Sequence, residues 1–413
     1  MIVNKIQVGD FKLGKEERDA IIKVLDSGRL SEGPKVREFE EEWAKFIGTK
    51  HSILTSSGTA AIMCGLSALK YHNKYKIKEG TNIITSPITY IATSNAIVLT
   101  NFKPVYVDID RKTFNITPEN IKEYLEKNNN SDCSVILPVH LMGYPCDMNK
   151  INKIAKQHGL VTFEDSAQAH GTIYEGKKTG ALSLLSDFSF YIAHNIQAGE
   201  MGAITTDDDE INRLVRKIKT NGRMCDCKIC VRATGQCVKL KKHEKENPKN
   251  VEDFDPRFSH DLIGYNFKTM EFQAALGLTQ LKKAGWIIKK RQENVKYLNE
   301  GLEEFSDILQ LPFYSNKISY LAYPLLINKP NTISRKNLRT ELEKKNVETR
   351  PLFGCIPTQQ KAYSYLKKEY ENKLPNADYV GQNAFYIGCH QYLERNELDY
   401  VIKTFKEILG KRL

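Results

Sequence analysis

A histidine, an aspartate and a hydroxyl-rich turn in the first half of the chain carry side chains suited to proton transfer and anion binding. His194 follows Ser189 by five residues, and a glycine-rich stretch comes directly after it. Asp165 closes a short apolar run that begins at Leu160. Imidazole has an unperturbed pKa of about 6.5, so it can accept and return a proton near neutral pH. We therefore expect His194 to act as a general base or acid.

The elements around these residues predict one shared site. Apolar, strand-like runs alternate with helical segments from about His51 to Asp208, which is typical of βαβ units and a mainly parallel sheet. Asp165 would then lie at the carboxyl end of a buried strand, where open α/β sheets bind ligands. Ser57, Gly58 and Thr59 stand between a strand and a helix, and such a turn presents N–H groups and hydroxyls to a phosphate. It is not a P-loop, because no Gly-Lys-Ser follows.

Each of these residues also has a purely structural interpretation. A lone histidine is more often a satisfied residue in a turn than a catalytic group. Asp165 and Ser57 are both of the types that cap helix N-termini. The interpretation as a site depends on their occurring together at these spacings.

Four cysteines crowd into thirteen residues, which favours metal or redox chemistry over disulfides in a cytosolic protein. They are Cys225, Cys227, Cys230 and Cys237. Thiolates suit an iron–sulfur cluster, with zinc as the alternative. A surface loop with inert thiols is the remaining interpretation.

Length and composition agree with a large soluble enzyme and say little more. The chain has 413 residues, 41% of them hydrophobic, and its formal net charge is +11. The excess of lysine lies in solvated runs mixed with acidic residues, so we expect no nucleic-acid partner, and no apolar stretch is long enough to predict a membrane span. The first residues do not resemble a signal peptide, which predicts a cytoplasmic location. We expect a large domain over 1–280 with a cysteine-rich insertion at about 221–255. A connecting helix over 273–304 and a small C-terminal α/β domain would complete the chain, with the second domain spanning 281–413.

The motifs together resemble the DegT/DnrJ/EryC1/StrS family of pyridoxal-phosphate enzymes, over nearly the whole chain. The resemblance rests on EDSAQAHG (164–171) and on GRLSEGP (28–34), PVHLMG (138–143), GYNFK (264–268), ETRPLF (348–353) and YIGCHQYL (386–393). It implies the fold-type I transferase fold. It also implies a set of cofactor-binding residues: Ser57, Gly58, Thr59 and Ser189 for the phosphate, Tyr90 stacked on the ring, Asp165 at the ring nitrogen, and Gln168 nearby. Asn266 would cross to the phosphate of a neighbouring subunit, which implies a homodimer with shared active sites.

His194 stands where most members of that family have the lysine that anchors the cofactor. An imidazole can move protons but cannot form a stable imine. Within the family, this replacement is typical of nucleotide-sugar 3-dehydratases, which use pyridoxamine phosphate to remove the C3 hydroxyl of a nucleotide-linked 4-keto-6-deoxyhexose. Some of them carry an iron–sulfur cluster and receive electrons from an iron–sulfur flavoprotein reductase, whereas others use glutamate to regenerate the cofactor. The fourth cysteine ligand of the cluster-bearing type is replaced here by Ala167, so a cluster would need Cys230 as its fourth ligand.

Three other interpretations stay open at this point. A sugar aminotransferase shares nearly every motif, and the stretch 164–171 is closer to the aminotransferase version. A cofactor-binding regulatory or scaffold protein without catalysis would be expected to lose Asp165 and the phosphate-binding turn, and this chain keeps both. A protein engineered by replacing lysine with histidine is the third.

Overall fold

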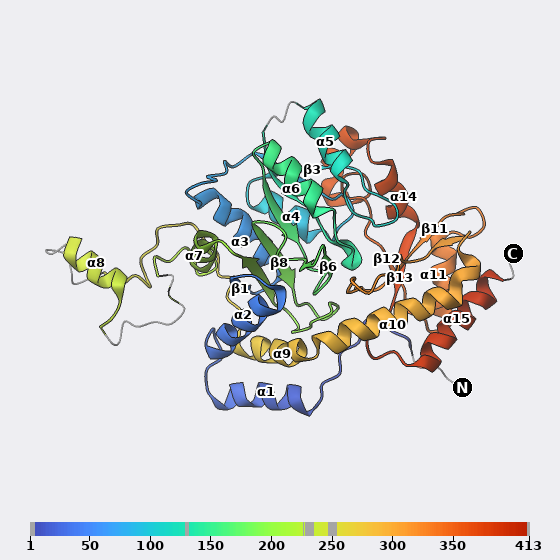
Figure 1. Cartoon of the computed structure of the whole chain (residues 1–413), viewed down its shortest axis with the longest axis horizontal. Coiled ribbons are helices and arrows are strands. Elements are labelled where there is room, and N and C mark those ends of the chain that lie inside the picture. The colour runs from blue at the N-terminus through green and yellow to red at the C-terminus, as the bar shows by residue number, and fades with distance from the viewer. Residues whose placement is uncertain (1–4, 129–131, 226, 228–234, 247–253, 411–413) are drawn as a thin grey trace.

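The computed structural model describes residues 5–128, 132–225, 227, 235–246 and 254–410 (Figure 1). A seven-stranded sheet lies beside a four-stranded sheet, and both are covered by helices. The larger sheet has the strand order β1-β9-β8-β5-β4-β2-β3. Its strands are β1 (His51–Thr55), β2 (Asn82–Thr85), β3 (Lys103–Tyr106), β4 (Cys133–Leu137), β5 (Val161–Asp165), β8 (Leu185–Ser189) and β9 (Gly202–Thr206).

Five neighbouring strands of this sheet pair in parallel, in the order β8-β5-β4-β2-β3, while β9 is antiparallel to both of its neighbours. The predicted mainly parallel sheet is therefore confirmed. Parallel neighbours require helical crossovers, which cover the sheet and make its strands apolar on both faces. The helices of this part are α1 (Lys15–Asp26), α2 (Pro34–Ile47), α3 (Gly58–Tyr71), α4 (Ala92–Leu99), α5 (Pro118–Lys127), α6 (Met148–Gln157), α7 (Asp209–Ile218), α8 (Val238–Glu246) and α9 (Glu271–Lys282), with a 3₁₀ turn at Leu141–Gly143 and a small hairpin of β6 (Ile173–Tyr174) and β7 (Lys177–Lys178).

The two faces of β8 carry different side chains, because successive residues of a strand point to opposite sides. Phe188 packs against Trp43 of α2, with ring centroids 5.0 Å apart. Leu185 and Ser189 lie on the other face, where each closely approaches a glycine of α3. Asp187, midway between them, therefore also faces α3. This alternation separates an aromatic core on one side of β8 from polar groups on the other.

The smaller sheet is antiparallel, with the order β10-β11-β13-β12. Its strands are β10 (Leu309–Gln310), β11 (Tyr323–Ile327), β12 (Arg350–Pro351) and β13 (Ala384–Ile387). The helices around it are α10 (Ala284–Leu302), α11 (Arg335–Lys344), α12 (Ile356–Gln359), α13 (Lys367–Tyr370), α14 (Pro375–Asn383) and α15 (Arg395–Leu409), with 3₁₀ turns at Glu303–Phe305 and Lys361–Leu366. Within the described residues, each helix is too short or too polar to cross a membrane.

The prediction of a single connecting helix over 273–304 is wrong in one respect. The structure has two helices there, α9 and α10, which meet at Lys283. The backbone of Lys283 has φ −93° and ψ 0°, and its ammonium group binds Glu17 of α1. The sequence pattern did not predict this break.

The close packing of α3 on the sheet gives a stability prediction. A Cβ atom added to Gly65 would lie 2.6 Å from the ring of Phe163 and 3.0 Å from a methyl group of Leu185. We expect Gly65→Ala to lower the free energy of unfolding by about 1–3 kcal/mol, because overpacking outweighs the gain in helix propensity. Gly285→Ala is the matched control, since no atom lies within 4 Å of its added Cβ in α10. Urea unfolding in which the two variants are equally stable would contradict this packing.

Candidate functional site

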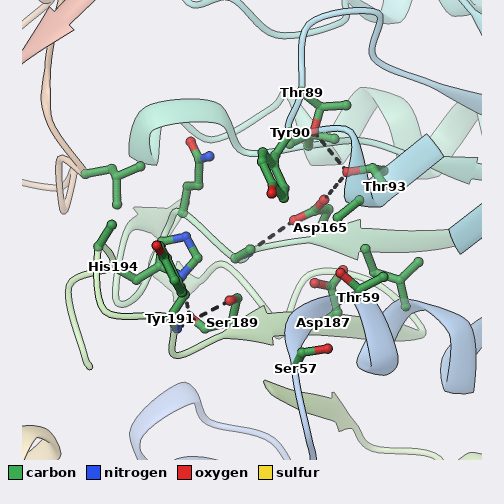
Figure 2. A pocket seen from close by; sticks show the side chains of 18 of the residues that line it. Ser57, Thr59, Thr89, Tyr90, Thr93, Asp165, Asp187, Ser189, Tyr191 and His194 are labelled. Atoms are coloured by element: carbon green, nitrogen blue, oxygen red, sulfur yellow. Dashed lines mark hydrogen bonds between the residues drawn. The ribbon is translucent and has the colours of Figure 1, made fainter. Parts of the chain in front are cut away.

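A cavity of about 560 Å³ opens where β5 and β8 end and α3 begins (Figure 2). The structure brings to it nearly all of the residues predicted as cofactor-binding or catalytic, from segments far apart in the sequence. Those lining it are Ser57, Gly58, Thr59, Tyr90, Asp165, Gln168, Ser189 and His194. Asn266 is not among the lining residues, and its backbone instead pairs with Thr220.

The start of α3 forms one wall of the cavity. Ser57 caps the helix by accepting the backbone N–H of Ala60 at 3.1 Å. The N–H groups of Gly58 and Thr59 come before the first intrahelical hydrogen bond, as at any helix N-terminus. Position 58 requires glycine because α3 and β8 approach closely there, and a Cβ on Gly58 would lie 2.7 Å from the Cβ of Ser189. The arrangement of a helix N-terminus with hydroxyls from two elements suits a phosphate.

Asp165 is buried at the end of β5 and is held by two donors. The Thr93 hydroxyl donates to its Oδ2 at 2.7 Å, and the backbone N–H of Ala167 donates to its Oδ1 at 3.2 Å. Thr89 lies 2.9 Å from Thr93 and completes a chain of hydroxyls (Figure 2). Burial raises the pKa of Asp165, and the two donors oppose that rise. A carboxyl group so placed is suited to pair with a cationic ring nitrogen.

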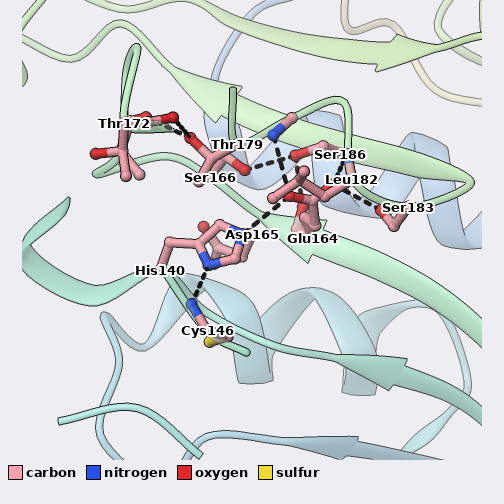
Figure 3. Close-up of polar contacts among 12 residues, drawn as sticks. His140, Cys146, Glu164, Asp165, Ser166, Thr172, Thr179, Leu182, Ser183 and Ser186 are labelled. Carbon is pink, nitrogen blue, oxygen red and sulfur yellow. Dashed lines mark hydrogen bonds and ion pairs between the residues drawn. The ribbon is translucent and has the colours of Figure 1, made fainter. Parts of the chain in front are cut away.

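Behind Asp165, a buried polar network fixes the end of β5 (Figure 3). Glu164 is fully buried and accepts hydrogen bonds from His140 Nε2, from the N–H groups of Gly180 and Leu182, and from the Ser183 hydroxyl, all at 2.9–3.0 Å. His140 Nδ1 accepts the N–H of Cys146, so its proton lies on Nε2. The backbone of His140 also donates to the carbonyl of Asp165 at 3.0 Å.

His194 lies opposite Asp165 across the cavity, and its hydrogen bond defines its tautomer. Its Nδ1 is 2.7 Å from the carbonyl oxygen of Ser189. A carbonyl can only accept, so Nδ1 carries the proton and Nε2 keeps its lone pair. Burial lowers the pKa of His194 to about 4, and the nearby Arg291 acts in the same direction. This pKa lies below the ordinary imidazole value of about 6.5, because the half-buried ring is partly removed from water and its charged form is disfavoured.

Gln168 and Tyr90 occupy the remaining predicted positions. Gln168 is buried and accepts the backbone N–H of Met142 at 2.9 Å, which fixes its amide. Tyr90 is 60% exposed and meets Phe353 edge-on, with ring centroids 5.9 Å apart. Its exposure leaves the ring accessible at the cavity mouth, as stacking on a planar ligand would require.

Three of the four cysteines predicted as metal ligands lie among the described residues of the insertion. Cys225 and Cys227 line a second cavity of about 440 Å³, whereas Cys237 is buried. Among the described residues, no group of three or more histidine, cysteine or acidic side chains is arranged to hold a metal ion. Cys230, the fourth predicted ligand, lies outside the described residues. We therefore derive no chemical step through an iron–sulfur cluster or a zinc ion.

Sequence reasoning missed several residues that line the cavity, among them Thr93, Asp187, Arg350 and Tyr386. Arg350 and Tyr386 lie in motifs that carry the family resemblance, but their types alone gave them no role. Thr93 follows Tyr90 by three residues, which was a usable signal because both lie where α4 begins. No sequence signal indicated a function for Asp187, since a single polar residue within a short apolar strand does not by itself predict a site.

The profile of the DegT/DnrJ/EryC1/StrS aminotransferase family matches residues 12–406. The chain belongs to this family. The predicted family is thereby confirmed, and with it the predicted fold class, because a solved structure of this fold superposes on 97% of the chain.

Three relatives show the range of activities around this sequence. The dTDP-4-dehydro-2,6-dideoxy-D-glucose 3-dehydratase of Saccharopolyspora spinosa is 30% identical over 97% of this chain and 85% of its own. The GDP-perosamine synthase of Caulobacter vibrioides is 27% identical over 98% of both chains. The structure of Escherichia coli GDP-4-keto-6-deoxy-D-mannose-3-dehydratase with bound hydrated pyridoxal phosphate has a TM-score of 0.85 and 27% identity, covering 97% of this chain and 99% of its own.

The environment of His194 predicts an unusual titration. Between the lowered pKa of about 4 and the ordinary value of about 6.5, the unfolded chain binds the proton and the folded chain does not. Acidification through this window therefore destabilises the fold, and the contribution is regained as the pH rises. We expect NMR titration of the cofactor-free protein to give a pKa near 4 for the imidazole signal that is lost in His194→Asn. A value at or above 6.5 would contradict the enclosure of the ring.

Proposed function

We propose that this enzyme is a pyridoxamine-phosphate-dependent 3-dehydratase of a nucleotide-diphosphate 4-keto-6-deoxyhexose. One observation carries the proposal. The described residues that line the cavity include His194 but no lysine, so the cavity offers a proton acceptor and no amine for anchoring the cofactor. Two of the relatives named above are 3-dehydratases of nucleotide-linked sugars.

Each wall of the cavity has a role in this proposal. Ser57, Gly58, Thr59 and Ser189 hold the cofactor phosphate, and Asp165 keeps the ring nitrogen protonated. When bound, the cofactor supplies an amine that condenses with the sugar ketone and a ring that accepts electron density. Arg350, at the edge of the smaller sheet, brings a guanidinium group to the cavity and suits the anionic diphosphate.

His194 performs the proton transfers. Its Nε2 accepts the proton that is lost after condensation, because Nδ1 is occupied by the Ser189 carbonyl. Protonated Nε2 then donates to the departing C3 hydroxyl, so the same atom serves as base and acid. The lowered pKa keeps the imidazole neutral, and therefore ready to accept, throughout the physiological pH range.

His194→Asn should abolish dehydration and leave cofactor binding within about threefold. Loss of a general base costs about 10²- to 10⁴-fold in rate, whereas the phosphate and ring contacts come from other residues. The measurement is loss of water from nucleotide-linked 4-keto-6-deoxyhexoses by mass spectrometry, with pyridoxamine phosphate binding followed by fluorescence.

Parallel assays with glutamate and with an anaerobic reductant would identify which route completes turnover. Ser189→Ala is the control and should weaken cofactor binding instead. Undiminished turnover by His194→Asn would refute the role of this residue. An amino sugar as the wild-type product would support the alternative function, a nucleotide-sugar aminotransferase like the perosamine synthase relative.

We also propose a homodimer with shared active sites. Asn266 does not line the cavity of its own chain, which supports a role for it in the site of a second copy. In the large-domain surface around it, Ile263 is 82% exposed and Met270 is 39% exposed, and such apolar side chains favour burial in an interface.

Subunit complementation tests this arrangement. Asn266→Ala and His194→Asn should each be inactive alone, and mixing them should restore part of the activity, because a hybrid dimer has one site that contains neither change. Activity would be measured after subunit exchange has been demonstrated with tagged chains. Complete absence of rescue would contradict a shared site.

A further inference from the structure

Asp187 is a buried carboxyl group in the cavity that neither the fold nor the proposed reaction explains. The residue has no exposed surface, and neither of its side-chain oxygens has a hydrogen-bond partner in the structure. It lies in the middle of β8, two residues before Ser189 and on the same face, and it lines the cavity beside Thr59 (Figure 2). A polar group so buried without a partner costs free energy unless something else satisfies it.

Asp187 is paired in strand register with Asp165, so two carboxyl groups stand side by side on β8 and β5. Their surroundings differ. Asp165 accepts hydrogen bonds from Thr93 and Ala167, which stabilise its ionised form, whereas Asp187 has no donor. Two adjacent buried carboxyl groups do not both ionise readily. The pair therefore carries one proton, and that proton belongs on Asp187.

The charges that face Asp187 all favour its neutral form. On β5 these are Asp165 and, from the opposite face of the sheet, Glu164, and together with burial they raise the pKa of Asp187 well above its usual range. The strand β9 contributes no titratable residue. The titratable side chains of α3 are Cys64, Lys70 and Tyr71. Lys70 and Tyr71 lie at the far end of that helix, with Lys70 bound to Glu79, and burial raises the pKa of the Cys64 thiol to about 12, which keeps it neutral.

A neutral carboxylic acid is a hydrogen-bond donor, and the part of the expected cofactor that would accept a hydrogen bond at the start of α3 is its phosphate. The protonated ring nitrogen is itself a donor and is served by Asp165. The phosphate oxygens are acceptors, and Ser189 and Thr59 are the polar neighbours of Asp187 at the cavity wall. We propose that Asp187 is a protonated acid that donates a hydrogen bond to the cofactor phosphate, so that the site holds its phosphate together with one protein-bound proton. This inference rests on the proposed function, because it takes the phosphate to lie at the start of α3.

Two substitutions test whether Asp187 acts as a hydrogen-bond donor or as a negative charge. Asp187→Asn keeps a donor of the same size and should bind pyridoxamine phosphate within about threefold of the wild type. Asp187→Ala removes the donor and should bind it about tenfold more weakly or worse. Neither change should alter binding of pyridoxamine, which lacks the phosphate. Titration of the cofactor-free protein with each ligand, followed by fluorescence at neutral pH, gives these affinities.

Infrared difference spectra of the cofactor-free protein provide a readout that does not depend on activity. The wild type should show the C=O stretch of a protonated carboxylic acid that Asp187→Asn lacks, and inorganic phosphate should shift it. As the pH rises through the pKa of Asp187, the acid ionises and repels the phosphate, so wild-type affinity should fall where that of Asp187→Asn does not. Glu200→Gln is the matched control, because it removes an exposed carboxyl group from the same cavity and should leave the infrared band in place.

The outcomes distinguish this inference from the proposed function. If the wild type binds pyridoxamine phosphate and Ser189→Ala weakens that binding, but both Asp187 variants match the wild type, the inference fails alone. Tighter binding by Asp187→Asn would mean that Asp187 is ionised, and would also overturn it. If the wild type binds neither form of the cofactor, the proposed function fails, whatever the infrared spectra show.

Discussion

The site depends on the hydrogen bonds that hold the buried carboxyl group of Glu164. Four donors converge on it, from the His140 ring, from two backbone N–H groups after β7 and from Ser183. A carboxyl group with no exposure is tolerated only when its oxygens are so fully satisfied. Because Glu164 precedes Asp165 on β5, the network that satisfies one carboxyl group also holds the next at the cavity. Loss of any one donor would leave a buried polar group under-satisfied directly behind the site.

Burial shifts the pKa of three cavity residues in opposite directions, and in each case it favours the neutral form. It raises the pKa of Asp165 and Asp187 and lowers that of His194. A bound phosphate would therefore face N–H groups and hydroxyls instead of ammonium groups at the start of α3. Binding by a helix N-terminus and neutral donors is well suited to such an enclosed anion. The free imidazole of His194 then remains the strongest uncharged proton acceptor facing the occupant.

Much of the site could be predicted because its residues occur in short motifs next to element boundaries. The alternation of apolar runs and helices placed Asp165 at a strand end and Ser57 at a helix start, and both positions were confirmed. The break between α9 and α10 at Lys283 was not predicted, because the apolar pattern runs through both helices without interruption. The partners of Asp165 also escaped prediction, because Thr93 reaches it from a helix 72 residues earlier in the chain.

The sequence by itself determined the chemical types at the site, the order of strands and helices, and the replacement of a lysine by His194. Only the tertiary structure decided how those groups behave. The tautomer of His194 follows from a carbonyl placed 2.7 Å away, and its lowered pKa follows from partial burial and from the charge of Arg291, a residue distant in sequence. The juxtaposition of Asp165 with Asp187 arises from the register of two parallel strands. Protonation depends on local dielectric and on neighbouring charges in space, and neither quantity is encoded in any short stretch of the chain.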